Sequence, residues 1–441
     1  MKIIPAHLKY FARLDQKQFL PRIEGKTVIL KADWNVTIKD GQIQNPEKID
    51  VAFQTLNHLL AHGANVIILS HFGRPKDKYE GKFSLRPVAE YVADIYPSAG
   101  VVFAGDAVDP VEGRLFATDE FVNSAVQAMA NDLNDHASSR IMLMENVRLA
   151  KSEQLDPRSQ AYQQFTDALL DLSDGLVVFD AAAVWDKSHA SITGILERAG
   201  QNRIAWGFHA HQQITELTES FTGELPAPCV IHISGTKPEK IKAIGGFLDN
   251  ESVTSILVSG NLANGFLEAK DVPVGEAAGI YDLKLIKKII ARDRFQSVVH
   301  LPTDFVIARP DGSDRQTITL ASSGIPEGFR QFDIGSETAI SYADILSQAA
   351  LAMNSGTAGA FDLKVNPFED GTRTIFQGFA RAARKTILGG DGGIAAKKYL
   401  TAEQLRDIDI NVGGGSILHF LAFQTCPVAE VFVNLAKAGK K

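Results

Sequence analysis

The sequence predicts an α/β protein of two domains, each a parallel sheet flanked by helices, with a hinge helix joining them. Short apolar runs alternate with helical patterns through the first half, as in chains that build parallel sheets. The same alternation resumes after the breaker-rich segment 223–228. The chain has 441 residues, 45% of them hydrophobic, which is too long for one ordinary core and sufficient for two.

Five apolar runs predict the strands of the first domain: residues 28–33, 66–70, 101–104, 141–144 and 176–179. Between the first two runs, apolar residues recur at the three- and four-residue spacing of a helix: Ile49, Phe53, Leu56 and Leu60. A longer connection follows the third run, with a helix expected at 119–133. This order of elements favours a parallel sheet.

Five more runs predict the strands of the second domain: residues 230–233, 256–258, 298–301, 386–388 and 408–411. A polar-faced helix is expected at 209–221, just before the breaker-rich segment. We therefore expect an amino-terminal domain at 1–207, a hinge helix at 208–222, a carboxyl-terminal domain at 223–421 and a tail at 422–441.

Polar residues gather where two predicted strands of the first domain end. Asp33 and Asn35 follow the first strand, and Ser70-His71-Phe72-Gly73-Arg74-Pro75 follows the second. Ligands of open parallel sheets bind at this carboxyl edge. A single basic residue here would more commonly be a solvated surface group, but the convergence of several favours a ligand site.

Two glycine clusters in the second half, 389–393 and 413–415, each follow a strand and precede a helix. Free backbone amides at a helix start favour phosphate. Either cluster alone is equally compatible with a tight turn that has no ligand, because turn geometry can itself require glycine. The two together favour a phosphate ligand.

Two common nucleotide motifs compete with this interpretation. The G-x-x-x-x-G-K-[ST] pattern of a P-loop does not occur in the sequence. Residues 390–395 fit G-x-G-x-x-A after a strand, but Asp407 and Asp409 lie at the start of the following strand rather than at its end. A dinucleotide-binding domain is therefore disfavoured.

Composition limits the partners and the compartment. The net charge of −7 gives no basic footprint for nucleic acid or an anionic membrane, which favours a small anionic metabolite. Cys229 and Cys426 are the only cysteines, consistent with a reducing compartment. The first seven residues are broken by Pro5 and are not expected to act as a signal peptide, and no later run reaches the ~20 apolar residues of a membrane span. We expect a cytoplasmic protein, acting as a monomer without nucleic-acid or membrane partners.

Four segments resemble the phosphoglycerate kinase family. D-W-N-V at 33–36 and S-H-F-G-R-P at 70–75 are similar to the family's D-F-N-V and S-H-L-G-R-P. E-N-V-R at 145–148 and D-I-G-S-E-T at 333–338 are similar to its E-N-x-R and D-I-G-P-E-T. The resemblance spans nearly the whole chain. It implies that the amino-terminal domain binds phosphoglycerate, that the carboxyl-terminal domain binds adenine nucleotide, and that the tail returns to the amino-terminal domain.

The resemblance also implies roles for individual residues. Asp33 and Asn35 would hold the glycerate hydroxyl, and the non-transferred phosphate would be bound by three basic residues: His71, Arg74 and Arg148. Lys48 and Lys187 complete the substrate set. Nucleotide binding, ATP or ADP with Mg²⁺, would fall to Lys237, Lys240, Asn354, Asp362, Gly389, Gly390, Asp391 and Gly392, with Asp391 at the metal. The catalytic group would be Lys48, Lys237, Gly390, Gly413 and Gly414.

Three departures from the family pattern fall within this set. Lys48 stands where the family has the arginine credited with stabilising the transferring phosphoryl group, and lysine lacks that residue's two-pronged geometry. Asp186 and Lys187 replace histidine and arginine, and the carboxylate would repel an anionic substrate unless it pairs with Lys187. Gly392 replaces threonine after Asp391, which removes a hydroxyl near the metal.

We therefore carry three functional hypotheses. The first is a working phosphotransferase that moves a phosphoryl group reversibly between 1,3-bisphosphoglycerate and ADP, as in glycolysis. The second is a family member that binds nucleotide or phosphorylated ligand with little catalysis. The third is an enzyme for a different carboxylate or acyl phosphate. The presence of both half-sites favours the first, and the changes at Lys48, Lys187 and Gly392 favour the second.

Overall fold

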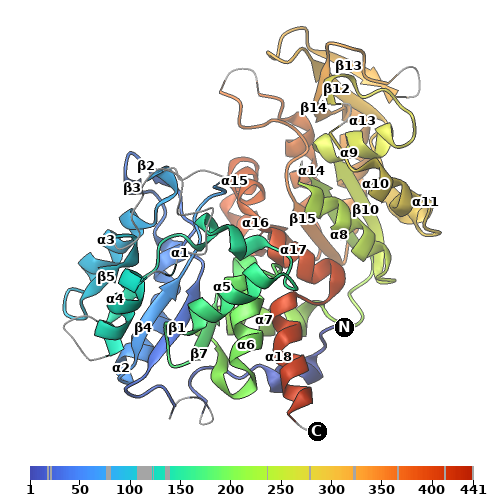
Figure 1. Cartoon of the computed structure of the whole chain (residues 1–441). Coiled ribbons are helices and arrows are strands. Elements are labelled where there is room, and N and C mark those ends of the chain that lie inside the picture. The colour runs from blue at the N-terminus through green and yellow to red at the C-terminus, as the bar shows by residue number, and fades with distance from the viewer. Residues whose placement is uncertain are drawn as a thin grey trace. The chain divides into compact units, whose positions relative to one another are not determined.

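The computed structural model describes residues 1–16, 19, 22–75, 81–106, 122, 124–134, 140–235, 237–277, 280–320, 324–364, 367–411 and 414–439. The chain divides into two compact units (Figure 1). Unit 1 comprises Met1–Ser220 together with Thr425–Lys441, and unit 2 comprises Phe221–Gln424. Each unit is built around its own sheet.

The sheet of unit 1 has six parallel strands in the order β5-β6-β4-β1-β7-β8. The two central strands are buried along their whole length, which explains why their sequences are almost continuously apolar. The strands are β1 (Thr27–Ala32), β4 (Asn65–Leu69), β5 (Val101–Phe103), β6 (Ile141–Leu143), β7 (Leu176–Asp180) and β8 (Ile204–Trp206). A short hairpin, β2 (Ile38–Lys39) with β3 (Gln42–Ile43), follows β1.

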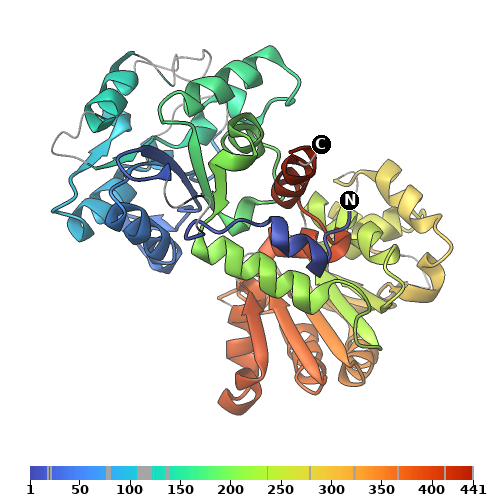
Figure 2. The ribbon, with the colours of Figure 1, turned by 90° about the horizontal axis from the view of Figure 1, so that it is seen from below.

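Helices flank this sheet (Figure 1). They are α1 (Glu47–Asp50), α2 (Phe53–Ala61), α3 (Arg86–Ile95), α4 (Ser124–Asn134), α5 (Gln160–Leu170), α6 (Ile195–Ala199), α7 (Phe208–Phe221) and α18 (Pro427–Ala438). The last of these contacts both α6 and the short helix η1 (Pro5–Tyr10). The two terminal segments therefore lie side by side in unit 1 (Figure 2), and the amino group of Met1 is 3.1 Å from Oε1 of Glu430.

Unit 2 contains a second six-stranded parallel sheet, in the order β11-β10-β9-β15-β16-β17, and a three-stranded antiparallel sheet, β13-β12-β14. The parallel strands are β9 (Cys229–Ser234), β10 (Val253–Ser259), β11 (Val299–His300), β15 (Leu351–Ser355), β16 (Arg384–Leu388) and β17 (Ile408–Asn411). The antiparallel strands are β12 (Asp304–Ala308), β13 (Gln316–Thr319) and β14 (Arg330–Ile334).

The helices of unit 2 follow the strands in alternation, as expected for parallel pairing. They are α8 (Pro238–Leu248), α9 (Gly260–Glu268), α10 (Leu283–Ile290), α11 (Phe295–Val298), α13 (Ser336–Ser347), α14 (Asp370–Phe379), α15 (Gly390–Tyr399), α16 (Ala402–Arg406) and α17 (Gly414–Phe423). Both α15 and α17 begin in a glycine cluster.

The predicted fold class, parallel sheets flanked by helices, is confirmed. The sequence analysis missed β8, β15 and the antiparallel sheet. β8 has only three residues, and the alanines of 349–352 continue the apolar pattern of α13, which hides the start of β15. Strand β13 is largely exposed and therefore lacks the buried alternation that reveals a strand.

The start of α7 is held by a buried carboxylate at the end of β7. Oδ1 of Asp180 accepts a hydrogen bond from the backbone of Ala210 at 2.7 Å, and Oδ2 accepts one from Oγ1 of Thr55 at 2.6 Å. Thr55 in turn accepts from the backbone of Phe208 at 3.0 Å. Burial raises the pKa of Asp180 to about 6 although these hydrogen bonds oppose the shift.

Within the described ranges, no single helix is both long and apolar enough to cross a membrane. Of the described helices, the bent pair α17 and α18 reaches the required length and composition when the two are taken together.

Candidate functional site

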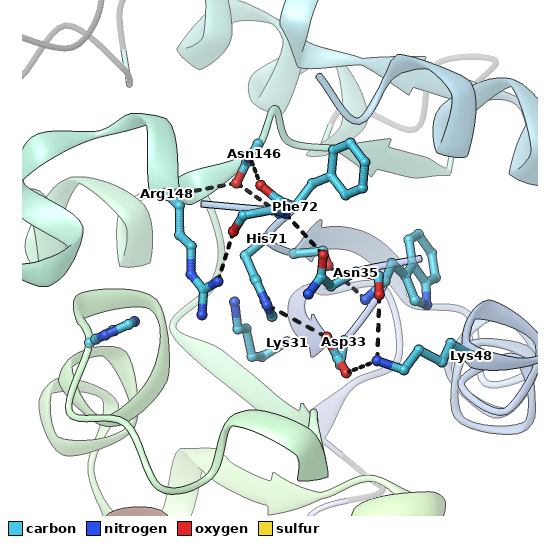
Figure 3. Close-up of polar contacts among 12 residues, drawn as sticks. Lys31, Asp33, Asn35, Lys48, His71, Phe72, Asn146 and Arg148 are labelled. Carbon is cyan, nitrogen blue, oxygen red and sulfur yellow. Dashed lines mark hydrogen bonds and ion pairs between the residues drawn. The ribbon is translucent and has the colours of Figure 1, made fainter. Parts of the chain in front are cut away.

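In unit 1, the structure brings together polar side chains that follow three parallel strands. Asp33 and Asn35 follow β1, His71 follows β4, and Arg148 follows β6. Because these strands are parallel neighbours, their carboxyl ends meet at one edge (Figure 3). We call these four residues, together with Lys48, the unit 1 cluster.

Asp33 lies at the centre of the unit 1 cluster. Lys48 and His71 reach its carboxylate from opposite sides (Figure 3). Nζ of Lys48 is 3.3 Å from Oδ2 of Asp33 and also donates to the backbone carbonyl of Asn35 at 3.4 Å. Nε2 of His71 is 3.8 Å from Oδ1, which is buried and has no hydrogen-bond partner among the described residues. That oxygen can therefore accept a hydrogen bond from a hydroxyl group of a ligand.

Asn35 holds the loop that carries the basic residues. Its Oδ1 accepts a hydrogen bond from the backbone of Gly73 at 2.9 Å, which leaves its NH₂ group to act as a donor. Gly73 has a φ of +58°, and an added Cβ would lie 2.6 Å from the ring of Phe83. Only glycine fits both constraints.

Asn146 fixes the same loop from β6. Its Oδ1 accepts from the backbones of Phe72 at 3.0 Å and Arg148 at 3.1 Å, and its Nδ2 donates to the carbonyls of Phe72 and Phe83. Nη1 of Arg148 then donates to the carbonyl of Gly73 at 2.9 Å. The E-N-x-R segment therefore combines a structural residue, Asn146, with a cation at the sheet edge.

The basic residues at this edge of the sheet differ in burial and in charge. Burial, with Arg148, Lys31 and Lys48 nearby, holds the pKa of His71 well below its ordinary value, so its ring is neutral. Burial also lowers the pKa of Arg148, which still carries its charge because an arginine guanidinium stays protonated in proteins. Arg74 is exposed. The edge thus presents positive charge suited to an anion.

A buried cluster that the sequence analysis missed lies beside these residues. Lys31 is 1% exposed, and its Nζ donates to Oγ of Ser191 at 3.0 Å. Ser191 donates to Oε1 of Glu153 at 2.6 Å. Burial lowers the pKa of Lys31 to about 8 and raises that of Glu153. A lysine within the apolar run 28–32 was the signal available in the sequence.

Lys187 and Asp186 form an ion pair, with 2.7 Å between Nζ and Oδ2. Oδ1 of Asp186 is buried and has no hydrogen-bond partner within the described ranges. Asp186 is also close enough to Arg148 to raise that residue's pKa, in opposition to burial. The acidic residue at this position is therefore partly neutralised by its neighbour in the chain.

In unit 2, the two lysines after β9 occupy different environments. Lys237 is exposed at the start of α8. Nζ of Lys240 donates to the backbone carbonyls of Ser234 and of Ser355, the latter at 2.7 Å. Burial, with Lys237 nearby, lowers the pKa of Lys240 to about 8. Lys237 is thus the lysine presented to solvent, and Lys240 ties β9 to β15.

The two glycine clusters meet at the ends of β16 and β17. Gly389 has a φ of +113° and Gly414 a φ of +46°, and a Cβ on Gly389 would lie 3.8 Å from Cα of Gly414. Gly390 is exposed in the first turn of α15. Gly413 lies outside the described residues. The starts of α15 and α17 are therefore adjacent.

Asp391 is exposed in the first turn of α15, and Asp362 is exposed in the turn after β15. Among the described residues no group of three or more His, Cys, Asp or Glu side chains forms a metal cage. Mg²⁺ that arrives with a nucleotide needs only one or two protein carboxylates, so the single carboxylate of Asp391 fits that role.

Close packing around residue 392 explains why this chain has glycine there. An added Cβ would lie 2.8 Å from Cγ2 of Ile387 and 3.0 Å from Oδ1 of Asn354. The threonine of the family pattern would therefore require its neighbours to move. Asn354 itself is fully buried on β15.

Comparisons with known proteins agree on one family. The family model described as phosphoglycerate kinase matches residues 18–423. The chain is 32% identical to the phosphoglycerate kinase of Roseiflexus castenholzii over 408 residues, covering 91% of this chain and 95% of that protein. It is 30% identical to that of Chlamydia muridarum over 417 residues, covering 92% and 96%.

Solved structures show the same fold. The phosphoglycerate kinase from Coxiella burnetii matches with a TM-score of 0.66 at 24% identity, covering 96% of this chain and 99% of that one. The enzyme from Pyrococcus horikoshii matches with a TM-score of 0.68 at 23% identity, covering 94% and 98%. The chain therefore belongs to the phosphoglycerate kinase family and is, by that membership, a phosphotransferase.

Proposed function

We propose that this protein transfers a phosphoryl group reversibly between ATP and the carboxylate of 3-phosphoglycerate, giving 1,3-bisphosphoglycerate and ADP. The observation that carries the proposal is the unit 1 cluster. It combines an oxygen of Asp33 that has no hydrogen-bond partner in the described part of the chain with cations on Lys48 and Arg148. A ligand with one hydroxyl and one phosphate would supply a donor for the Asp33 oxygen and an anion for the cations.

Phosphoryl transfer requires charge neutralisation and alignment more than covalent chemistry. An oxygen of the substrate carboxylate forms a bond to the γ-phosphorus, the bond from that phosphorus to the ADP oxygen breaks, and no proton is transferred. Asp33 and Asn35 would orient the hydroxyl, while His71, Arg74 and Arg148 would hold the non-transferred phosphate. Lys48 and Lys187 would neutralise the reacting end.

The nucleotide would be bound in unit 2. Its phosphates would meet Lys237 and the backbone amides at the starts of α15 and α17, which include Gly390 and Gly414. Asp391 would hold Mg²⁺, which neutralises charge on the phosphates. The adjacency of the two glycine turns supports this assignment.

We also propose that units 1 and 2 close during catalysis, with α7 as the hinge. In-line transfer needs the reacting atoms within about 3 to 3.5 Å, and the proposed ligands belong to separate units. Helix α7 runs to Phe221, where unit 2 begins. We further propose that the protein acts as a monomer in the cytoplasm, which size-exclusion chromatography and cell fractionation would test.

One set of contacts favours a second function, ligand binding with little catalysis. Lys48 is already paired with Asp33, and Lys240 is bound to backbone carbonyls. Both contacts would have to loosen if these lysines are to reach a phosphate. A protein that binds its ligands without transferring a phosphoryl group would not need Lys48 to leave Asp33.

A coupled assay with purified protein, magnesium, ATP and 3-phosphoglycerate tests the proposal. We expect turnover that requires all three components, and none with glycerate or acetate as acceptor because these lack the phosphate that Arg148 would hold. Nucleotide binding by calorimetry without turnover would support the binding-only function. Turnover with another carboxylate alone would redirect the proposal to a different acceptor.

A further inference from the structure

A buried histidine in unit 2 contacts Asn354, one of the residues proposed to bind the nucleotide. His232 lies on β9 and is paired in register with Asn354 on β15. Its ring is 0% exposed. Nε2 is 2.7 Å from Oγ of Ser259, and Nδ1 is 2.8 Å from Nδ2 of Asn354. Both ring nitrogens are therefore engaged.

The ring is neutral, because burial lowers the pKa of His232 to about 3. A neutral imidazole has one donor nitrogen and one acceptor nitrogen. With the proton on Nε2, the ring donates to Ser259 and accepts from the NH₂ of Asn354. With the proton on Nδ1, it accepts from the Ser259 hydroxyl and donates to the carbonyl oxygen of Asn354. Each arrangement satisfies both ring nitrogens.

The two arrangements differ in which group of the Asn354 amide faces α15, the carbonyl oxygen Oδ1 or the NH₂ group. In the first arrangement, Oδ1 faces away from His232. It is buried and has no hydrogen-bond partner among the described residues. That atom lies against Gly392, where an added Cβ would come within 3.0 Å of it. A carbonyl oxygen beside a phosphate is repelled, whereas an NH₂ group in the same place donates to it.

We propose that His232 is a positioning residue for the nucleotide phosphates, whose tautomer decides which edge of Asn354 faces the start of α15. With a phosphate bound there, the ring carries its proton on Nδ1, holds Oδ1 of Asn354, and accepts from Ser259. The NH₂ group of Asn354 then points at the phosphate. The ring's net proton count is unchanged. This inference rests on the proposed nucleotide role of Asn354.

The tautomer can be read directly from the protein labelled with ¹⁵N-histidine. The ring nitrogens of a neutral histidine differ in chemical shift according to which one carries the proton. With magnesium and a non-hydrolysable ATP analogue bound, we expect His232 to carry its proton on Nδ1. A ring protonated on Nε2 in the nucleotide complex would overturn the proposal.

Substitutions supply an independent test through calorimetric nucleotide binding, which does not depend on turnover. His232→Leu should weaken binding of the magnesium nucleotide about three- to tenfold, the range for one lost hydrogen bond. His232→Asn, which keeps an amide near the position of Nδ1, should restore most of the affinity. Unchanged affinity in the leucine variant would overturn the proposal. If that variant does not fold, the tautomer measurement and the asparagine variant decide.

Tyr342→Phe provides the matched control. The hydroxyl of Tyr342 is also buried in unit 2, and it lies within hydrogen-bond distance of the backbone carbonyls of Val258 and His300 rather than of the Asn354 amide. This variant should lower the melting temperature and leave nucleotide affinity unchanged. A native protein that binds nucleotide with the expected His232 dependence but transfers no phosphoryl group would disprove the proposed function and leave this inference intact.

Discussion

Nζ of Lys48 lies 3.3 Å from Oδ2 of Asp33 at the carboxyl edge of the first sheet. The pair joins two of the residues proposed to bind the substrate. Asp33 is 12% exposed and Lys48 38% exposed, so the ammonium can turn toward solvent while the carboxylate stays fixed. A lysine in this place supplies a point charge, where an arginine would supply two parallel donors.

Replacement of Lys48 should test its role in transfer. We expect Lys48→Ala to lower kcat by roughly 10²- to 10³-fold, the effect of removing one group that stabilises transition-state charge. Lys48→Arg should raise kcat, because the two-pronged donor suits a transferring phosphoryl group. Lys26→Ala is the control, since Lys26 pairs with Asp174 at 3.2 Å just before β1. If the alanine variant turns over at the native rate, Lys48 is only a surface residue.

Alanine variants of the two arginines proposed to bind the substrate should affect KM alike but should differ in stability. Arg74→Ala and Arg148→Ala should each raise the KM for 3-phosphoglycerate about tenfold or more and leave nucleotide affinity unchanged. Only Arg148→Ala should also lower the melting temperature, because Nη1 of Arg148 holds the carbonyl of Gly73 whereas Arg74 is exposed. Loss of nucleotide binding in both variants would refute the assignment.

The carboxylate of Asp186 should lower the affinity for an anionic substrate, because it pairs with Lys187. Asp186→Asn removes the carboxylate that holds Nζ of Lys187 at 2.7 Å. We expect the KM for 3-phosphoglycerate to fall about two- to fivefold, as a rim charge becomes available to the ligand. Asp167→Asn breaks a surface pair with Arg198 and should not change KM. A higher KM in Asp186→Asn would show that this carboxylate helps to build the site.

Asp180 should make stability depend on pH. The pKa of Asp180 is about 6 in the folded state and 3.8 for an ordinary aspartate, as in the unfolded chain. Between these pH values the folded state therefore binds more protons than the unfolded state. Stability should therefore fall as pH rises from 4 to 6, by up to about 3 kcal/mol. Asp180→Asn should remove this slope, measured as the native-minus-variant difference in urea unfolding. The exposed Asp94→Asn serves as the control, and an identical difference at pH 4 and pH 7 would contradict the assignment.

Much of this fold was predictable because parallel strands are buried on both faces and therefore appear as continuous apolar runs. Exposed β13 and the short β8 escaped prediction because their sequences lack that pattern, whereas β12 was missed although its sequence is apolar and buried. The domain boundaries and the hinge role of α7 stay predictions.

The site was predictable where a strand end carries an unusual polar residue. Asp33, His71 and Arg148 belong to motifs that the sequence shows plainly, and the structure brings them to one edge. The partners that shape the site were not predictable, because they come from distant segments. Ser191 lies 160 positions from Lys31, and His232 lies 122 positions from Asn354.

We propose that this chain moves a phosphoryl group with Lys48 in place of an arginine. Transfer of radiolabel from γ-labelled ATP to 3-phosphoglycerate tests it most directly. We predict labelled product from the native protein and from Lys26→Ala, and at least 100-fold slower labelling with Lys48→Ala. No labelled product from native protein that binds both ligands by calorimetry, or equal labelling by the native protein and Lys48→Ala, would contradict the claim.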